Sequence, residues 1–128
     1  MNVVDSSGWL EYFADGPNAG FFAKAVESAS NLVVPTLSLY EVFKRVLQQR
    51  GEGDALQAVA IMQQGRVMEL TSTLALSAAR IRIDLGIPMA DSVILATTRA
   101  CDATLWTQDA DFENIRGVKY TPSKKRSG

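Results

Sequence analysis

Four acidic residues occupy the same kind of position in this chain, at points where a short apolar run ends or a helix is predicted to begin. One follows Val3-Val4 directly, and another follows the apolar run at 103–106 after two residues. The other two lie in the first turns of helices predicted after Pro35 and Pro88. The four are Asp5, Glu41, Asp91 and Asp109. Because ligands of open parallel sheets bind outside the carboxyl ends of the strands, we expect these carboxylates to meet there.

The residues around two of these acids indicate that they are not fully solvated. Glu41 lies among apolar residues between 37 and 43, and Asp91 among apolar residues between 87 and 94. Carboxylates brought together in a partly dry site repel one another, which raises their pKa values, and a divalent cation relieves that cost. Ligation by oxygen alone suits Mg²⁺ or Mn²⁺ and disfavours zinc or copper. Such a cation can activate water against a phosphodiester, so the acids predict metal-dependent hydrolysis.

The composition excludes most other kinds of catalytic site. The chain has 128 residues, no histidine and a single cysteine, Cys101. These counts exclude a serine–histidine–acid triad, any histidine-ligated metal site, a four-thiolate zinc site and an intrachain disulfide. Thirteen Lys and Arg stand against 14 Asp and Glu, so the net charge of −1 gives no overall positive field of the kind that marks many nucleic-acid-binding proteins.

The elements that must position the acids follow from the apolar patterning. Short apolar runs predict buried strands at residues 2–4, 32–34, 67–70, 103–106 and 118–120. Helical spacing predicts helices from about residue 8 and at 18–29, 37–47, 55–62, 72–85 and 88–100. Strands that alternate with helices require crossover connections, so the predicted fold class is α/β with a mostly parallel sheet covered on both faces.

Each of the four acids also has an ordinary structural interpretation. Asp5 can cap the helix that follows it, and Asp109 can close a turn. Glu41 follows Ser38 at the spacing of a capping box and precedes Arg45 at the spacing of a helical ion pair. The remaining acid lies near a helix N-terminus, where the helix dipole stabilises a negative charge. These alternatives stay open from the sequence alone.

Four segments of the chain share their order and intervals with a known family. They are Val4-Asp5-Ser6-Ser7, Ser38-Leu39-Tyr40-Glu41-Val42, Ala90-Asp91-Ser92 with the following Ala96-Thr97, and Leu105-Trp106-Thr107-Gln108-Asp109-Ala110-Asp111-Phe112. Through these segments the chain resembles the PIN domain, and more specifically the VapC-type toxin ribonucleases of bacterial toxin–antitoxin pairs. The resemblance extends from about residue 2 to residue 120.

The resemblance implies a three-layer α/β/α PIN-like domain and a Mg²⁺- or Mn²⁺-dependent endoribonuclease that cleaves structured RNA such as tRNA or rRNA. The residues that match the family's catalytic and metal-binding acids are Asp5, Glu41, Asp91 and Asp109. Asp111 matches a second acid often found two residues later and is expected as an outer ligand. Ser6 or Thr107 is expected to hydrogen-bond a carboxylate or a metal-bound water, which would orient the ligands.

The resemblance also implies protein partners. These are a second copy of the chain, in a homodimer, and a cognate VapB-type antitoxin whose C-terminal segment winds over the toxin and inserts a basic side chain among the acids. No apolar window is long enough for a membrane span and no secretory signal is evident, so we expect a cytoplasmic protein without membrane contact. The expected organisation is a nuclease domain at 1–120 followed by a basic, disordered tail at 121–128.

Two other functions compete with this interpretation. The first is a non-catalytic, PIN-like protein-binding module in which the acids serve only as caps. The second is a phosphoryl-transfer domain of receiver or phosphatase type, but the segment after Asp5 lacks the second aspartate of the phosphatase motif, and the strand at 103–106 lacks a receiver's lysine.

Aromatic and basic side chains outside the acid motifs are candidate contacts for RNA or for an antitoxin. Most of the aromatic residues are expected in the core, and the ones nearest to Asp5 are Trp9, Tyr12 and Phe13. The basic candidates are Lys44, Arg45, Arg50 and the tail residues Lys124, Lys125 and Arg126. A solvated surface charge is the simpler role for each basic residue.

Overall fold

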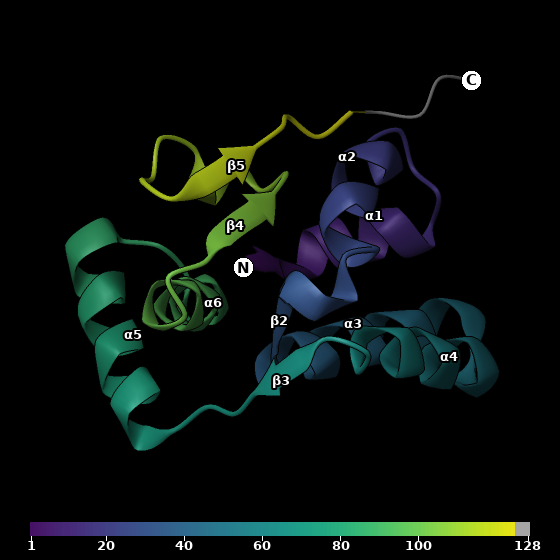
Figure 1. Ribbon diagram of the computed structural model, residues 1–128, viewed down its shortest axis with the longest axis horizontal. Coiled ribbons are helices and arrows are strands. Elements are labelled where there is room, and N and C mark those ends of the chain that lie inside the picture. The colour runs from purple at the N-terminus through teal and green to yellow at the C-terminus, as the bar shows by residue number, and fades with distance from the viewer. Residues whose placement is uncertain (125–128) are drawn as a thin grey trace.

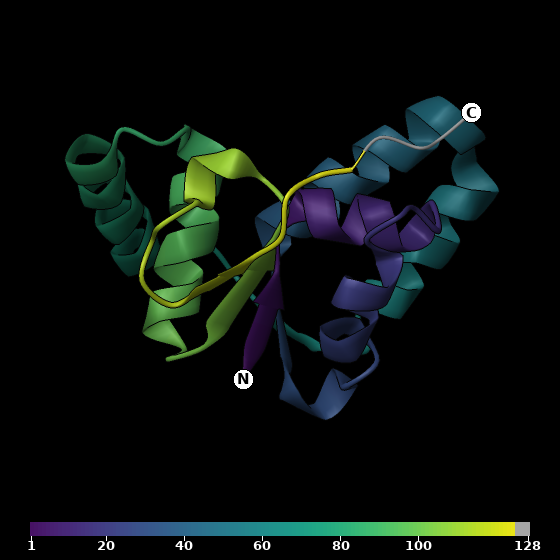
Figure 2. The ribbon, with the colours of Figure 1, turned by 90° about the horizontal axis from the view of Figure 1, so that it is seen from above.

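A five-stranded sheet lies between two groups of helices in the computed structural model, which describes residues 1–124 (Figures 1 and 2). The strands are β1 (Asn2–Val4), β2 (Leu32–Pro35), β3 (Arg66–Met68), β4 (Thr104–Thr107) and β5 (Val118–Tyr120). The α-helices are α1 (Ser6–Phe13), α2 (Ala19–Val26), α3 (Thr36–Arg50), α4 (Glu52–Met62), α5 (Ser72–Leu85) and α6 (Met89–Ala100). Two 3₁₀ helices, η1 (Ala29–Asn31) and η2 (Ala110–Phe112), complete the described elements.

The sheet has the order β3-β2-β1-β4-β5, and each of its pairings is parallel. The first strand therefore lies in the centre, with Asn2 paired to Leu32 on one side and to Thr104 on the other. All five carboxyl ends lie at the same edge, as Figure 2 shows for the strands beside the N-terminus. The residues that follow β1 and β4 are consequently neighbours in space, although about 100 positions separate them in the sequence.

Neighbouring residues of each central strand pack on opposite faces of the sheet. Val4, Val34 and Trp106 contribute to a core that α1, α2, α3 and α4 cover. Their predecessors along the chain, Val3, Val33 and Leu105, contribute to a second core under α5 and α6. A strand buried on both sides has no polar face, which explains the uninterrupted apolar runs in the sequence.

The predicted α/β class with helices on both faces is confirmed, and the differences are local. The sheet is parallel throughout the described residues, rather than mostly so. The first helix begins at Ser6 instead of near residue 8, because Asp5 is its N-cap. The helix predicted over 18–29 ends at Val26, and η1 carries the chain from there to β2.

None of the helices within residues 1–124 combines the length and apolar character that crossing a membrane requires. The tail expected at 121–128 is described only as far as Lys124, without helix or strand, and residues 125–128 lie outside the described part. The division at residue 120 therefore stays a prediction.

Gly8 offers a test of how tightly α1 is seated on the sheet. A Cβ at this position would lie 2.6 Å from the Phe22 ring and 2.7 Å from Val4 Cγ1, both in the core. We predict that Gly8→Ala lowers the free energy of unfolding by about 1–3 kcal/mol, the usual cost of overpacking. Urea unfolding followed by circular dichroism measures this change.

The matched control is Gly20→Ala, another glycine within a helix, where nothing lies within 4 Å of the added carbon. Alanine favours a helix over glycine, so this variant should be unchanged or more stable by up to ~1 kcal/mol. Equal effects of the two substitutions would contradict the close contact of Gly8 with Phe22 and Val4.

Candidate metal centre

Three of the four predicted acids lie together at the carboxyl edge of the sheet. Asp5 follows β1 and Asp109 follows β4, and the pairing of Val4 with Trp106 brings these two strand ends side by side. Asp91 lies in the first turn of α6, which Pro88 precedes as N-cap. The topology thus delivers three acids from separate parts of the chain to one place.

Asp5 is almost completely buried, with 2% of its surface exposed. Its carboxylate accepts hydrogen bonds from Thr107 Oγ1 at 2.6 Å, from the Gly8 amide at 2.8 Å and from Ser7 Oγ at 2.9 Å. Burial raises the pKa of Asp5 to about 6, because desolvation outweighs the three hydrogen bonds, which lower the pKa; the charge of Asp109 raises it further. The side chain is fixed in place and does not lose its proton as readily as an exposed aspartate.

Three further carboxylates converge beside Asp5. One oxygen from each of Asp91, Asp109 and Asp111 lies within 4.8 Å of the other two. Burial raises the pKa of Asp91 to about 7, and the charges of Asp109, Asp111 and Asp5, with a hydrogen bond to Asp111, raise it as well. The convergence therefore has an electrostatic cost, which a bound cation would remove.

The loop that carries two of these acids has its own bracing. Thr107 Oγ1, besides donating to Asp5, accepts a hydrogen bond from the Asp109 amide at 2.9 Å. Asp109 in turn caps η2, because its Oδ1 accepts from the Asp111 amide at 2.9 Å. Thr107 thus has the carboxylate-supporting position expected of it. Asp111, expected as an outer ligand, lies within the tightest group of acids.

Glu41 belongs to the same edge but not to that group of three. Its Oε1 accepts a hydrogen bond of 2.6 Å from Ser6 Oγ, and Ser6 directly follows Asp5. The expectation that Ser6 would contact a carboxylate therefore agrees with the structure. The capping-box interpretation is wrong, because α3 begins at Thr36 and its N-cap is Pro35, which places Ser38 and Glu41 inside the helix.

Two of the other acids do serve as helix caps, in agreement with their ordinary structural interpretation. Asp5 caps α1 and Asp109 caps η2. Asp91 lies in the first turn of α6, where the helix dipole favours a negative charge, but burial and the charges of neighbouring acids raise its pKa, so the helix N-terminus alone does not account for it. A set of caps would have no need for three converging carboxylates. The donor set, made of carboxylate oxygens with no histidine or thiolate, fits a hard cation such as Mg²⁺ or Mn²⁺.

Ser7 belongs to the sequence motif that contains Asp5 but had no predicted role, and it donates to both oxygens of Asp5. Most aromatic residues were expected in the core, and Trp9, one of the candidates nearest to Asp5, is fully buried there and stacks on Phe13 with ring centroids 5.7 Å apart. The apolar positions on both sides of Trp9 gave no sign of which aromatic faces inward, since α1 is only eight residues long.

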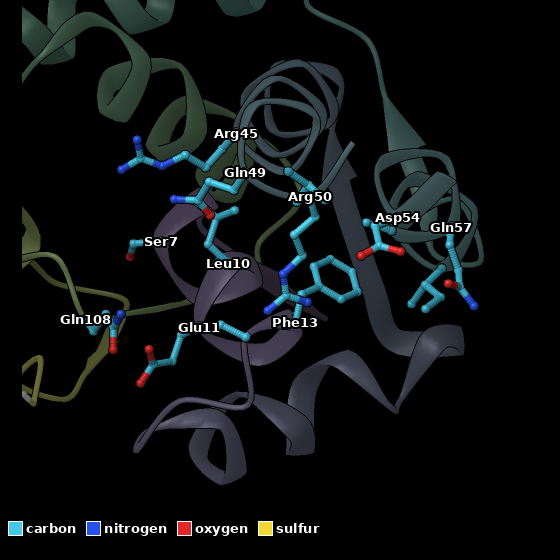
Figure 3. A pocket seen from close by; sticks show the side chains of 14 residues that line it. Ser7, Leu10, Glu11, Phe13, Arg45, Gln49, Arg50, Asp54, Gln57 and Gln108 are labelled. Carbon is cyan, nitrogen blue, oxygen red and sulfur yellow. The ribbon is translucent and has the colours of Figure 1, made fainter. Parts of the chain in front are cut away.

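Residues of α1, α3 and α4 line a groove of about 620 Å³ (Figure 3). Its apolar part includes Leu10, Phe13, Val46 and Ile61, and its polar part includes Glu11, Arg45, Gln49, Arg50, Asp54 and Gln57. At one end lie Ser7, which hydrogen-bonds Asp5, and Gln108, which precedes Asp109. The groove therefore ends where the acid centre begins.

The comparisons with known proteins agree with this architecture. A family model described as the PIN domain matches residues 3–118. The comparison with curated proteins returned no match.

Several solved structures share the fold at low sequence identity. A toxin–antitoxin complex from Klebsiella pneumoniae superposes with a TM-score of 0.80 at 18% identity, covering 98% of this chain and 100% of that one. VapC20 of Mycobacterium tuberculosis, described as a sarcin–ricin loop cleaving toxin, gives a TM-score of 0.77 at 21% identity, covering 92% and 97%. VapBC2 of Rickettsia felis, bound to a DNA fragment from its promoter, gives a TM-score of 0.72 at 13% identity, covering 94% and 97%.

The raised pKa values of Asp5 and Asp91 predict how the stability of the metal-free protein depends on pH. Between about pH 4 and 7 the folded state binds more protons than the unfolded state, so the free energy of unfolding falls as pH rises through this range. Asp91→Asn removes one charge from the repulsive group, so this variant should be more stable than the wild type at pH 8.

After allowance for partial exposure, the expected gain from Asp91→Asn is roughly 1–2 kcal/mol, or about 3–8 °C in Tm. At pH 4, where the wild-type Asp91 is also uncharged, the difference should nearly vanish. Thermal unfolding in the presence of a chelator measures both values. A variant less stable than the wild type at pH 8 would argue against carboxylate repulsion in this centre.

Proposed function

Because this chain belongs to the PIN-domain family, we propose that it is a divalent-metal-dependent endoribonuclease and the toxin of a toxin–antitoxin pair. The observation that carries the proposal is the convergence of Asp91, Asp109 and Asp111 beside the buried Asp5. A family model that spans nearly the whole chain and the similarity of the fold to VapC structures support the same assignment.

The four aspartates would have different roles because their surroundings differ. Asp91, Asp109 and Asp111 would hold Mg²⁺ or Mn²⁺, because their oxygens already lie within 4.8 Å of one another. Asp5 adds a buried negative charge whose orientation Ser7, Gly8 and Thr107 fix. These hydrogen bonds fix the orientation of the Asp5 carboxylate. Little further side-chain entropy would therefore be lost when a ligand binds.

Glu41 would take part from α3. Its carboxylate accepts a hydrogen bond from Ser6 Oγ, which links α3 with the start of α1 next to Asp5. A bound cation would supply the Lewis acidity that lowers the pKa of an attacking water and neutralises charge on the phosphodiester. The acids would also accept protons, since the chain has no histidine to serve as a general base.

We propose structured RNA, of the tRNA or rRNA class, as the substrate. The printed description of VapC20 names a structured RNA element, the sarcin–ricin loop, for that protein. An enzyme that cleaves such RNA would act in the cytoplasm. Shape and phosphate contacts dominate the recognition of folded RNA, so the basic surface residues Lys44, Arg45 and Arg50 would contribute to binding rather than to chemistry.

The groove between α1, α3 and α4 supports an antitoxin as partner. An amphipathic segment of a VapB-type antitoxin could place apolar side chains over Leu10, Phe13 and Ile61. Because Ser7 and Gln108 form one end of the groove, a segment lying in it would reach the acids, where a basic side chain would be attracted. Such a segment would block the centre and so inhibit the enzyme.

Exposed apolar side chains support a homodimer. On α5, Leu76 is 69% exposed and Ile83 is 84% exposed, and their spacing of seven residues places them on one helix face. Met89, at the start of α6, is also 69% exposed. A second copy of the chain that covered these side chains would remove apolar surface from water.

The decisive test of the catalytic proposal is cleavage of total bacterial RNA, with the ends mapped, by wild type and Asp91→Asn in Mg²⁺ or Mn²⁺. We expect cleavage at defined sites by the wild type, its loss on addition of EDTA, and a loss of at least ~100-fold in Asp91→Asn, because one ligand carboxylate is gone. Asp84→Asn, the same substitution at an exposed position of α5, should retain wild-type activity.

Full activity of Asp91→Asn would refute the proposal. A folded wild-type protein that neither cleaves RNA nor changes its Tm with Mn²⁺ would favour the non-catalytic binding module instead, since only a ligand of the native state raises Tm.

The dimer is tested separately by light scattering after size exclusion. We expect the wild type at twice the 13.9 kDa mass of the chain and Ile83→Asp shifted towards the monomer, because a charge would be buried at the interface. Leu56→Asp, at an exposed position of α4, is the matched control and should stay dimeric. An unchanged mass for Ile83→Asp would exclude this face of α5 as the interface.

A further inference from the structure

Asn18 lies in the turn between α1 and α2 and is 97% buried, with 3% of its surface exposed. Its side-chain amide donates two hydrogen bonds, one to Gln108 Oε1 and one to the Pro122 carbonyl, each at 2.9 Å. Its backbone amide donates to Glu11 Oε2 at 2.7 Å. One residue thus connects the first two helices with the segments that follow β4 and β5.

The hydrogen bond from Asn18 to Gln108 restrains the loop that carries the acids, because of the position of Gln108 in the sequence. It is the residue between Thr107, which is bonded to Asp5, and Asp109, the first acid of the loop. Thr107 Oγ1 restrains this loop on the side of Asp5, and the cap of η2 restrains it internally. The bond from Asn18 is the restraint that reaches Gln108 from outside the loop.

The loop needs such a restraint for an electrostatic reason. Asp109 and Asp111 face Asp91 across the centre, and like charges at this range push the exposed loop away from α6. A buried amide with both of its hydrogens bonded is costly to displace, because moving the loop would leave polar groups unpaired. Asn18 therefore opposes the outward movement.

The Pro122 bond reinforces this arrangement. After β5 the chain continues across the molecule towards α1, and its course is visible in Figure 2. The Thr121 amide donates to the Thr107 carbonyl at 3.0 Å, and the next residue accepts from Asn18. The segment that follows β5 is thereby attached both to the end of β4 and to Asn18, so it holds the base of the acid loop from the other side.

We propose that Asn18 is a positioning residue for the metal centre: through Gln108 it holds Asp109 and Asp111 at the separation from Asp91 that cation binding requires. This inference rests on the proposed function, since it assumes that the centre binds a divalent cation. Asn18 itself does not contact the cation or the substrate. It acts on the affinity for metal by keeping the ligand oxygens converged before the cation arrives.

The test is the Mn²⁺ affinity, measured by isothermal titration calorimetry on the full chain, of the wild type, Asn18→Ala, Gln108→Ala and the double variant. We expect each single variant to raise the Kd for Mn²⁺ by about 10-fold or more, the usual effect of removing a group that orients metal ligands. Because both substitutions remove the same hydrogen bond, the double variant should be no weaker than Asn18→Ala. RNA cleavage should return to near the wild-type rate at saturating Mn²⁺.

Two variants keep the test decisive. Gln108 is only partly buried, so Gln108→Ala decides the question even if Asn18→Ala fails to fold. Asn31→Ala, the same substitution at an exposed residue of η1 before β2, should leave the Kd unchanged.

Wild-type Kd values in folded Asn18→Ala and Gln108→Ala, or additive effects in the double variant, would overturn the positioning role while leaving the metal site in place. A wild-type protein that does not bind Mn²⁺ at all would overturn the metal-dependent function as well, so the two failures are distinguishable.

Discussion

Repulsion between carboxylates is the interaction on which the rest of this structure depends. Burial raises the pKa of Asp5 and Asp91, the charges of neighbouring carboxylates raise both further, and these acids have no mutual attraction that would keep them together. The restraint comes from hydrogen-bond donors around the centre. A domain of this size has only about 5–15 kcal/mol of net stability, so a concentrated charge is retained at a cost that function must justify.

The fold meets this requirement by joining elements distant in sequence at one sheet edge. Parallel pairing of β1 with β4 is what brings Asp5 and Thr107 within 2.6 Å, and the same edge receives the N-terminal turns of α3 and α6. The hydrogen bonds then divide into local ones, such as the caps of α1 and η2, and long-range ones that join separate elements. Ser6 with Glu41, Thr107 with Asp5, and Asn18 with Gln108 are of the second kind.

The strands, and the location of acids at the edge of the sheet, could be predicted from the sequence because both depend on local sequence patterns. Apolar runs such as Val3-Val4 identify strands buried on both faces, and an acid directly after such a strand must lie at the ligand-binding edge of a parallel sheet. Which of the acids at this edge come close together could not be predicted in the same way. The closeness of Asp111 to Asp91 depends on the turn of η2, and the role of Asn18 depends on bonds across 90 and 104 residues that leave no periodic pattern. Ser6 was expected to contact a carboxylate, but only the packing of α1 against α3 shows that this carboxylate is Glu41.

The central claim is that the converging carboxylates form a cation site. The most direct measurement is anomalous diffraction at the manganese edge from crystals grown with Mn²⁺. We expect one or more peaks bonded to oxygens of Asp91 and of Asp109 or Asp111, at about 2.0–2.2 Å as expected for a small octahedral cation. Strong anomalous peaks elsewhere, with none among these three carboxylates while their loop keeps its position, would contradict it.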